Sequence, residues 1–182
     1  MLFAGLLAAH GQKGPAEIPA KRMYTFKHVM RLAHDLGVTI AVPKSHPFNP
    51  LTALRLACLP LAAPLRNALI DALWCAVWAD GGGIEDEAVL RSVLTRLGHD
   101  PDALLAQART DEVKATLRAN TDDAIARGVF GVPSMRVGDE VFWGVDSLDH
   151  VEAFLEGRDP IDPALVERVR SMRATAHRRG SP

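Results

Sequence analysis

The stretch that decides the fold is GVFGVPSMRVGDEVFWGVDSLDHVEAFL, residues 128–155. Two short apolar runs, at 134–137 and 140–143, are separated by Gly138 and Asp139. Glycine and aspartate tolerate the positive φ angles that tight hairpin turns require. Apolar residues of the two runs alternate with polar or small ones, as in a half-buried pair of strands: Met135, Val137, Val141 and Trp143. The stretch therefore predicts a β-hairpin.

The residues that flank the hairpin predict how the chain enters and leaves it. Pro133 suits the first residue of a strand, because proline cannot donate a ladder hydrogen bond. The bond between Val132 and Pro133 is a candidate cis peptide, although most such bonds are trans. Ser147 is a good N-cap residue. Apolar residues behind it recur at helical spacing: Leu148, Val151, Phe154 and Leu155.

A resemblance to a known family rests on these residues. The segments GVFGVP at 128–133 and FWGVDSL at 142–148 resemble the C-terminal signature of the 2-hydroxychromene-2-carboxylate isomerases. Two more segments, PAEIPAKR at 15–22 and HPFNP at 46–50, match the same family. The family belongs to the DsbA-like branch of the thioredoxin superfamily, beside the kappa-class glutathione transferases. The resemblance covers nearly the whole chain.

Helical spacing dominates the middle of the chain, from residue 19 to residue 127. One clear stripe has apolar residues four apart, which predicts a core-facing helix: Leu65, Leu69, Leu73 and Val77. Residues 1–7 are apolar but too few for periodicity to decide between a helix start and a strand end. The resemblance implies that they are the end of a strand.

The resemblance implies an α/β fold that is mostly helical by content. Residues 1–18 and 128–182 would form a thioredoxin-like part, and residues 19–127 would form an inserted all-helical subdomain. Family members begin with a β-α-β unit, which we expect to be missing from this chain.

Composition argues against several classes of protein. The 182 residues suffice for one domain with a core, and the formal net charge of −1 would attract neither nucleic acid nor acidic membranes. No apolar run reaches the ~18 residues of a membrane span. The 7 histidines do not fall at metal-ligand spacing, so we expect no metal site. Basic residues near the C-terminus fit a solvated helix end better than an RNA contact: Arg168, Arg170, Arg173, Arg178 and Arg179.

The two cysteines bear on redox function. Cys58 and Cys75 are far apart in the sequence and form no C-x-x-C motif. We expect both to be buried, reduced thiols in a cytoplasmic protein. Their spacing argues against a disulfide oxidoreductase.

The resemblance also implies a glutathione site around the hairpin. The backbone of Val132 would bind the cysteinyl part as an added strand, and a cis bond before Pro133 would aim its polar groups at the ligand. Asp146 would pair with the α-ammonium group, while Ser147 and nearby helix amides would hold the α-carboxylate. Gln12 stands where the family usually carries a glutathione-contacting asparagine, but a solvated loop glutamine is an equally good interpretation.

Other residues are candidates for the substrate cleft. Asn49 matches a family position that borders this cleft, and it is also a candidate N-cap for the next helix; the two roles are compatible. Trp74 and Trp78 are further candidates for the cleft, although aromatic residues on an apolar helix usually pack in the core.

The resemblance implies a glutathione-dependent isomerase of the 2-hydroxychromene-2-carboxylate type, acting on a small aromatic substrate in aromatic catabolism. Family members carry a serine whose hydroxyl stabilises the glutathione thiolate. No serine of this chain lies in that motif, so no catalytic residue is assigned. We expect isomerase activity only if the missing N-terminal unit is present.

Two alternatives remain open. The first is a kappa-class-like glutathione transferase or an oxidoreductase of the DsbA family. The second is a non-catalytic protein that binds glutathione or another protein. An exposed sheet edge would favour a homodimer.

Overall fold

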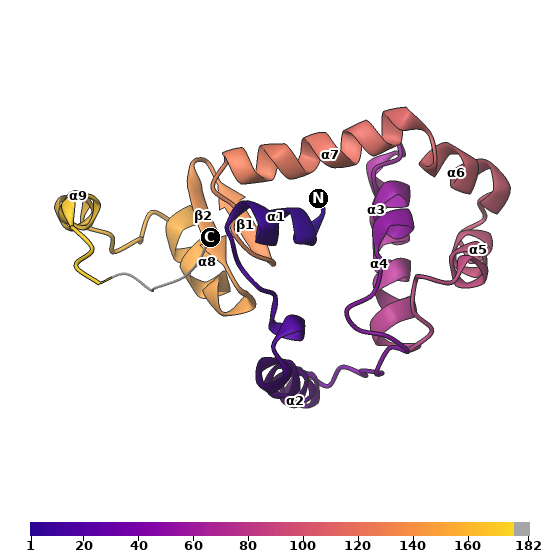
Figure 1. The fold of residues 1–182 in the computed structure, drawn as a ribbon, viewed down its shortest axis with the longest axis horizontal. Helices are drawn as coiled ribbons and strands as arrows, with labels where there is room; N and C mark the ends of the chain where they lie inside the picture. Colours follow the sequence, from indigo (N-terminus) through magenta and orange to yellow (C-terminus); the bar gives the residue numbers. More distant parts are fainter. Residues whose placement is uncertain (177–182) are drawn as a thin grey trace. The chain divides into compact units, whose positions relative to one another are not determined.

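The computed structural model of the protein describes residues 1–176, which are mostly helical (Figure 1). In chain order the elements are α1 (Phe3–Ala9), η1 (Pro15–Glu17), α2 (Pro19–Asp35), α3 (Leu51–Ala57), α4 (Ala63–Trp78), α5 (Glu87–Arg96), α6 (Pro101–Ala108), α7 (Asp111–Ala126), β1 (Ser134–Val137), β2 (Glu140–Trp143), η2 (Val145–Ser147), α8 (Leu148–Leu155) and α9 (Pro163–Ser171). Here η1 and η2 are short 3₁₀ turns. Over the described range, no helix has the length and apolar character needed to cross a membrane.

Contacts divide the chain into two compact units, Met1–Gly131 and Val132–Pro182. The first unit holds the helices from α1 to α7, and the second holds the hairpin, α8 and α9. The expected division into a thioredoxin-like part and a helical insertion stays a prediction. Of the basic residues near the C-terminus, Arg178 and Arg179 lie outside the described residues.

The core of the first unit lies among α3, α4, α5 and α6, with the start of α7. Three of the four residues in the predicted α4 stripe are buried, whereas Leu65 in the first turn of that helix is 46% exposed. The stripe is therefore confirmed as core over the last three turns of α4. The capping residues of α5, α6 and α7 accept backbone N–H groups from the first turn of each helix: Asp86, Asp100 and Thr110.

Residues 1–7 contribute to a helix, α1, so the strand end implied by the resemblance is wrong. Leu6 is fully buried, and the N–H of Leu2 donates a 2.9 Å hydrogen bond to Oγ1 of Thr121 on α7. A Cβ at Gly5 would lie 2.9 Å from the side chain of Thr121, so the glycine permits the close approach of the two helices. Packing against α7 thus favours the helix.

The predicted hairpin is confirmed, because β1 and β2 pair antiparallel with Met135 opposite Phe142. Gly138 occupies the turn with φ of 61°. α8 packs on the face that carries Phe142, whose ring centroid lies 5.6 Å from that of Phe154. Successive side chains of a strand point to opposite faces, so Val141 lies on the other face. Both faces of the hairpin therefore carry apolar side chains.

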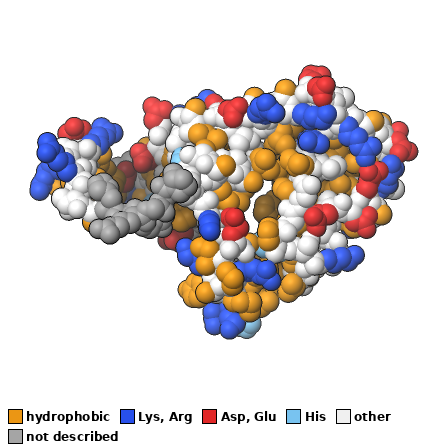
Figure 2. Space-filling view, in the orientation of Figure 1, with side chains coloured by type: hydrophobic (Ala, Val, Ile, Leu, Met, Phe, Trp, Pro, Cys, Tyr) orange, Lys and Arg blue, Asp and Glu red, His pale blue; other side chains and the backbone are white. Residues whose placement is uncertain are grey.

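The helix predicted to start at Pro19 is confirmed as α2. Only Ala33 of this helix is buried. Large apolar side chains in α2 and just after it are exposed: Met23, Tyr24, Val29, Met30, Leu36 and Val38. Figure 2 shows such hydrophobic side chains on α2 beside lysine and arginine side chains. This helix has much less apolar burial than its sequence pattern predicts.

Both cysteines are free thiols, but the prediction that they are buried is wrong. Cys75 is exposed and Cys58 is half-buried. On α4, a rotation of about 100° per residue turns Cys75 away from the side that carries Leu73 and Val77. Apolar residues occur nearly all round this helix in the sequence, so the sequence did not predict that Cys75 lies on its exposed side.

Candidate functional site

The corner between β2 and α8 joins several of the predicted glutathione residues. Gly144 has φ of 89°, in the left-handed region that favours glycine. Its N–H donates a 3.0 Å hydrogen bond to the carbonyl oxygen of Pro133, and its own carbonyl accepts the N–H of Ser147 at 3.2 Å. The structure thus brings Pro133 and Ser147 to the same corner. The peptide bond between Val132 and Pro133 is cis, and Val132 is 42% exposed.

Asp146 belongs to this corner as well. A Cβ added at Gly144 would overlap the Oδ1 atom of Asp146, so the carboxylate lies directly against the glycine. The side chain of Asp146 is exposed. A carboxylate held in this way is available to a cationic ligand group.

Ser147 precedes α8, but its hydroxyl does not cap the helix. Instead the hydroxyl donates a 2.6 Å hydrogen bond to the carbonyl oxygen of Trp143, at the end of β2. The N-cap position was predicted correctly, and the expected capping hydrogen bond is absent from the described structure. The preference of serine for N-cap positions does not predict this hydrogen bond. The carbonyl oxygen of Trp143 comes within reach of the hydroxyl only when β2 and the corner have folded.

Gln12 and Asn49, the other predicted contacts, belong to the first unit. The N–H of Gln12 donates to the carbonyl oxygen of Leu7 at 2.9 Å, and its side chain is exposed. Oδ1 of Asn49 accepts the N–H of Leu51, the first residue of α3, at 3.0 Å. The N-cap residue of that helix is Pro50, so Asn49 lies one residue before the cap position predicted for it. No hydrogen bond among the described residues joins Gln12 to Asn49.

The loop that carries Asn49 is anchored by a carboxylate that the sequence analysis did not single out. The N–H of Asn49 donates to Oε1 of Glu85 at 2.9 Å, and the hydroxyl of Ser45 donates to the other carboxylate oxygen. These two bonds, the backbone one first, lower the pKa of Glu85 below its ordinary value. Glu85 is therefore an ionised group at neutral pH.

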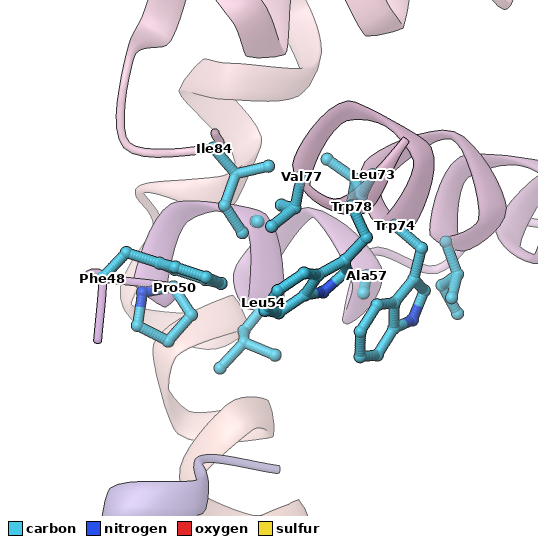
Figure 3. A pocket seen from close by; sticks show the side chains of 11 residues that line it. Phe48, Pro50, Leu54, Ala57, Leu73, Trp74, Val77, Trp78 and Ile84 are labelled. Carbon is cyan, nitrogen blue, oxygen red and sulfur yellow. The ribbon is translucent and has the colours of Figure 1, made fainter. Parts of the chain in front are cut away.

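An apolar pocket lies beside this loop in the first unit, with a volume of about 200 Å³. Figure 3 shows the side chains that line it, and all of them are apolar or aromatic. They come from the 48–50 loop, α3, α4 and Ile84. The most prominent are Phe48, Leu54, Leu73, Trp74, Val77 and Trp78. The sequence analysis left the role of the two tryptophans open, and both prove to line the pocket, with Trp74 61% exposed.

His46 borders the same region through aromatic contacts. Its ring centroid lies 5.8 Å from that of Phe48 and 5.7 Å from that of Trp78. Burial, and then the positive charge of Arg22, lower the pKa of His46 below 6.5. The imidazole is therefore neutral at pH 7. Among the described residues its buried Nδ1 atom has no hydrogen-bond partner.

Residues 2–156 match the family model of the DSBA-like thioredoxin domain. The chain belongs to this family. A solved structure of 2-hydroxychromene-2-carboxylate isomerase shares the fold of this DsbA-like protein with a TM-score of 0.79, over 96% of this chain and 82% of that chain, at 23% sequence identity. The thioredoxin-like fold class predicted from the resemblance is confirmed.

Curated relatives of this DsbA-like chain have two kinds of name. Glutathione S-transferase kappa 2 of Caenorhabditis elegans is 32% identical over 168 residues, which cover 84% of this chain and 75% of that protein. The 2-hydroxychromene-2-carboxylate isomerase of Pseudomonas putida is 34% identical over 153 residues, covering 83% and 74%. The isomerase of Sphingobium xenophagum is 36% identical over 89 residues, and this match spans only 46% of that protein.

Proposed function

We propose that this chain binds glutathione and acts with it on a small aromatic substrate, as an isomerase of the 2-hydroxychromene-2-carboxylate type. The observation that carries the proposal is the corner at Gly144, where Pro133, Asp146 and Ser147 meet. The names of the relatives support it, since they include isomerases of this type and kappa-class glutathione transferases.

The residues at the corner fit the γ-glutamyl end of glutathione. The exposed carboxylate of Asp146 would pair with the α-ammonium group. Backbone N–H groups in the first turn of α8 would bind the α-carboxylate. The hydroxyl of Ser147 donates to Trp143, so it would offer its lone pairs to the ammonium unless this bond opens. The backbone of Val132 would take the cysteinyl part as an added strand.

Glutathione, when bound, would supply a thiol nucleophile. We assign no catalytic residue of this chain to that thiol. Gln12 stays a proposed glutathione contact. The pocket lined by Trp74 and Trp78 would hold the aromatic part of the substrate, and Asn49 lies in the loop that borders it.

A kappa-class-like transferase is the second candidate. Its support is the match to the kappa-class protein of Caenorhabditis elegans, which extends over 75% of that relative. Product analysis would separate the two functions: an isomerase converts 2-hydroxychromene-2-carboxylate without consuming glutathione, whereas a transferase forms a conjugate with an electrophile. If glutathione binds and neither reaction occurs, the non-catalytic alternative holds.

The expected homodimer is also a proposal. The exposed apolar side chains of α2, among them Met23 and Met30, support it, because soluble monomers rarely leave large apolar patches open. Light scattering over a range of protein concentrations tests it. A monomer at all concentrations would argue against the dimer.

Calorimetric titration with glutathione tests the proposed function. The wild-type chain should bind, and Asp146→Asn should weaken binding by about tenfold or more, because a charged partner is lost. Asp149→Asn is the matched control, since Asp149 is exposed in the first turn of the same helix. It should change the affinity less than about threefold, which corresponds to ~0.7 kcal/mol. Absence of binding by the wild type, or equal effects of the two variants, would overturn the proposal.

A further inference from the structure

The pocket in the first unit is notable for the absence of charge in its lining. All of its lining side chains are apolar or aromatic, and the indole nitrogens of Trp74 and Trp78 are the polar side-chain atoms among them. An apolar ring gains free energy when it leaves water for such a surface. A carboxylate that entered with the ring would lose its hydration, and no cation of the lining would replace it.

Volume limits the size of the ligand. The pocket measures about 200 Å³. An apolar cavity of about 150 Å³ holds one benzene. The pocket therefore suits one ring or two fused rings. Trp74, which is 61% exposed, leaves one side of the pocket open to solvent.

A negative charge next to the lining adds to the discrimination between neutral and anionic ligands. Glu85 follows the lining residue Ile84, and its ionised carboxylate accepts the N–H of Asn49, between the lining residues Phe48 and Pro50. This exposed carboxylate repels an anionic ligand that approaches the loop, although solvent screens the effect.

Within the described part of the chain, the pocket lining holds no cation that would offset this negative charge. His46 contacts Phe48 and Trp78, but its imidazole is neutral at pH 7, for the reasons given above. Two cations lie outside the lining, as Glu85 does: Arg22, whose charge acts on His46, and Arg55 on α3, whose buried Nε has no hydrogen-bond partner among the described residues. Among the lining residues themselves, no side chain would pair with an anion that entered the pocket.

We propose that this pocket takes the uncharged ring of an aromatic ligand, of one or two fused cycles, and excludes a carboxylate from its interior. The inference rests on the proposed function, in that the ring is taken to be the substrate's. It narrows the substrate class, because a carboxylate-bearing substrate would have to keep its charged end outside the pocket. A neutral ligand meets no such restriction.

Equilibrium dialysis with two probes of the same ring tests this selectivity at pH 7. Naphthalene-methanol is neutral and naphthoate is anionic. The neutral probe should bind about tenfold or more tightly than the anion. Trp74→Ala should weaken binding of the neutral probe about fivefold, since a large exposed ring surface is removed. Tyr24→Ala is the matched control, because Tyr24 is 66% exposed in the same unit and does not line the pocket.

The inference is overturned if naphthoate binds as tightly as the neutral probe, if neither probe binds, or if Tyr24→Ala matches the effect of Trp74→Ala. Circular dichroism of each variant checks that the helices remain folded. Glutathione binding is measured on the same samples. Loss of glutathione binding with normal probe selectivity would remove the proposed function and leave the pocket's selectivity in place.

Discussion

The hydroxyl of Ser147 donates a 2.6 Å hydrogen bond to the carbonyl oxygen of Trp143, which joins the residue before α8 to the last residue of β2. Two residues at the corner between strand and helix are thus fixed relative to each other. The bond holds the serine hydroxyl in place and directs its proton toward the carbonyl oxygen of Trp143, so this proton is not offered to a ligand.

Replacing Ser147 by alanine should therefore affect stability more than ligand binding. Loss of the hydrogen bond should lower the free energy of unfolding by about 1 kcal/mol. The affinity for glutathione should change less than about threefold, or ~0.7 kcal/mol. Denaturant unfolding and calorimetry measure the two quantities. Ser171→Ala is the control, because the hydroxyl of Ser171 also donates to a backbone carbonyl, that of Arg168 in α9. A tenfold loss of glutathione affinity in Ser147→Ala alone would instead show that the hydroxyl turns to the ligand.

Gly144→Ala should weaken glutathione binding as well as the fold. The new Cβ would overlap Oδ1 of Asp146, and alanine rarely adopts φ of 89°. Backbone strain alone should cost about 1–3 kcal/mol. Gly138→Ala is a matched control, since Gly138 has φ of 61° and a Cβ added there would meet no heavy atom within 4 Å. Both variants should be destabilised, and only Gly144→Ala should also lose glutathione affinity in calorimetry. If the two variants bind glutathione with equal affinity, Asp146 does not contribute to glutathione binding.

Glu85 should stabilise the protein in a pH-dependent way. Hydrogen bonds from the N–H of Asn49 and the hydroxyl of Ser45 lower its pKa in the folded state. Its contribution is therefore complete above the ordinary value of 4.5 and is lost as pH falls through the lower folded pKa. Thermal melting should show a stability difference between wild type and Glu85→Gln that shrinks as pH falls below 4.5. A difference that is constant with pH would contradict the assignment.

His46 should make the protein sensitive to mild acid. Burial and the charge of Arg22 lower its pKa in the folded state, so the unfolded chain takes up a proton first as pH falls below 6.5. The stability that the neutral ring provides is complete above 6.5 and is lost toward the lower folded pKa. His46→Phe keeps an aromatic ring and removes the buried Nδ1 that has no partner among the described residues. Its advantage in melting temperature should grow as pH falls from about 7 to about 5.5, a range that spans the ordinary histidine pKa.

His34→Phe is the control for the histidine prediction, because His34 is exposed near the end of α2. It should show no growing advantage over the same pH range. If the two variants respond equally, the acid sensitivity belongs to histidines in general.

The sequence predicted most of the local structure around the candidate site. Gly138 marked the turn of the hairpin, and the residues of α8 followed at helical spacing. The sequence preferences for turns and helices depend on a few neighbouring residues, so tertiary contacts rarely override them. The hydroxyl of Ser147 is different, because its acceptor at Trp143 exists only once the corner has formed.

The apolar pocket could not be predicted in the same way. Trp74 and Trp78 had the same appearance as core residues in the sequence, yet both line the pocket and Trp74 is largely exposed. The lining combines a loop, two helices and Ile84, and no local pattern reports how such elements approach one another. Glu85 was not singled out from the sequence either, because its role as the anchor of the loop at Asn49 depends on contacts between residues 36 and 40 positions apart.

The sequence by itself determined the hairpin, most of the helices and the family to which the chain belongs, because these depend on short-range backbone preferences and on local motifs. The tertiary structure alone decided that residues 3–9 form a helix, that Cys75 faces solvent and that an uncharged pocket forms beside Asn49. These outcomes depend on which side chains meet across distant parts of the chain. Burial and close packing arise from contacts between residues that are far apart in the sequence, so they exist only in the folded chain.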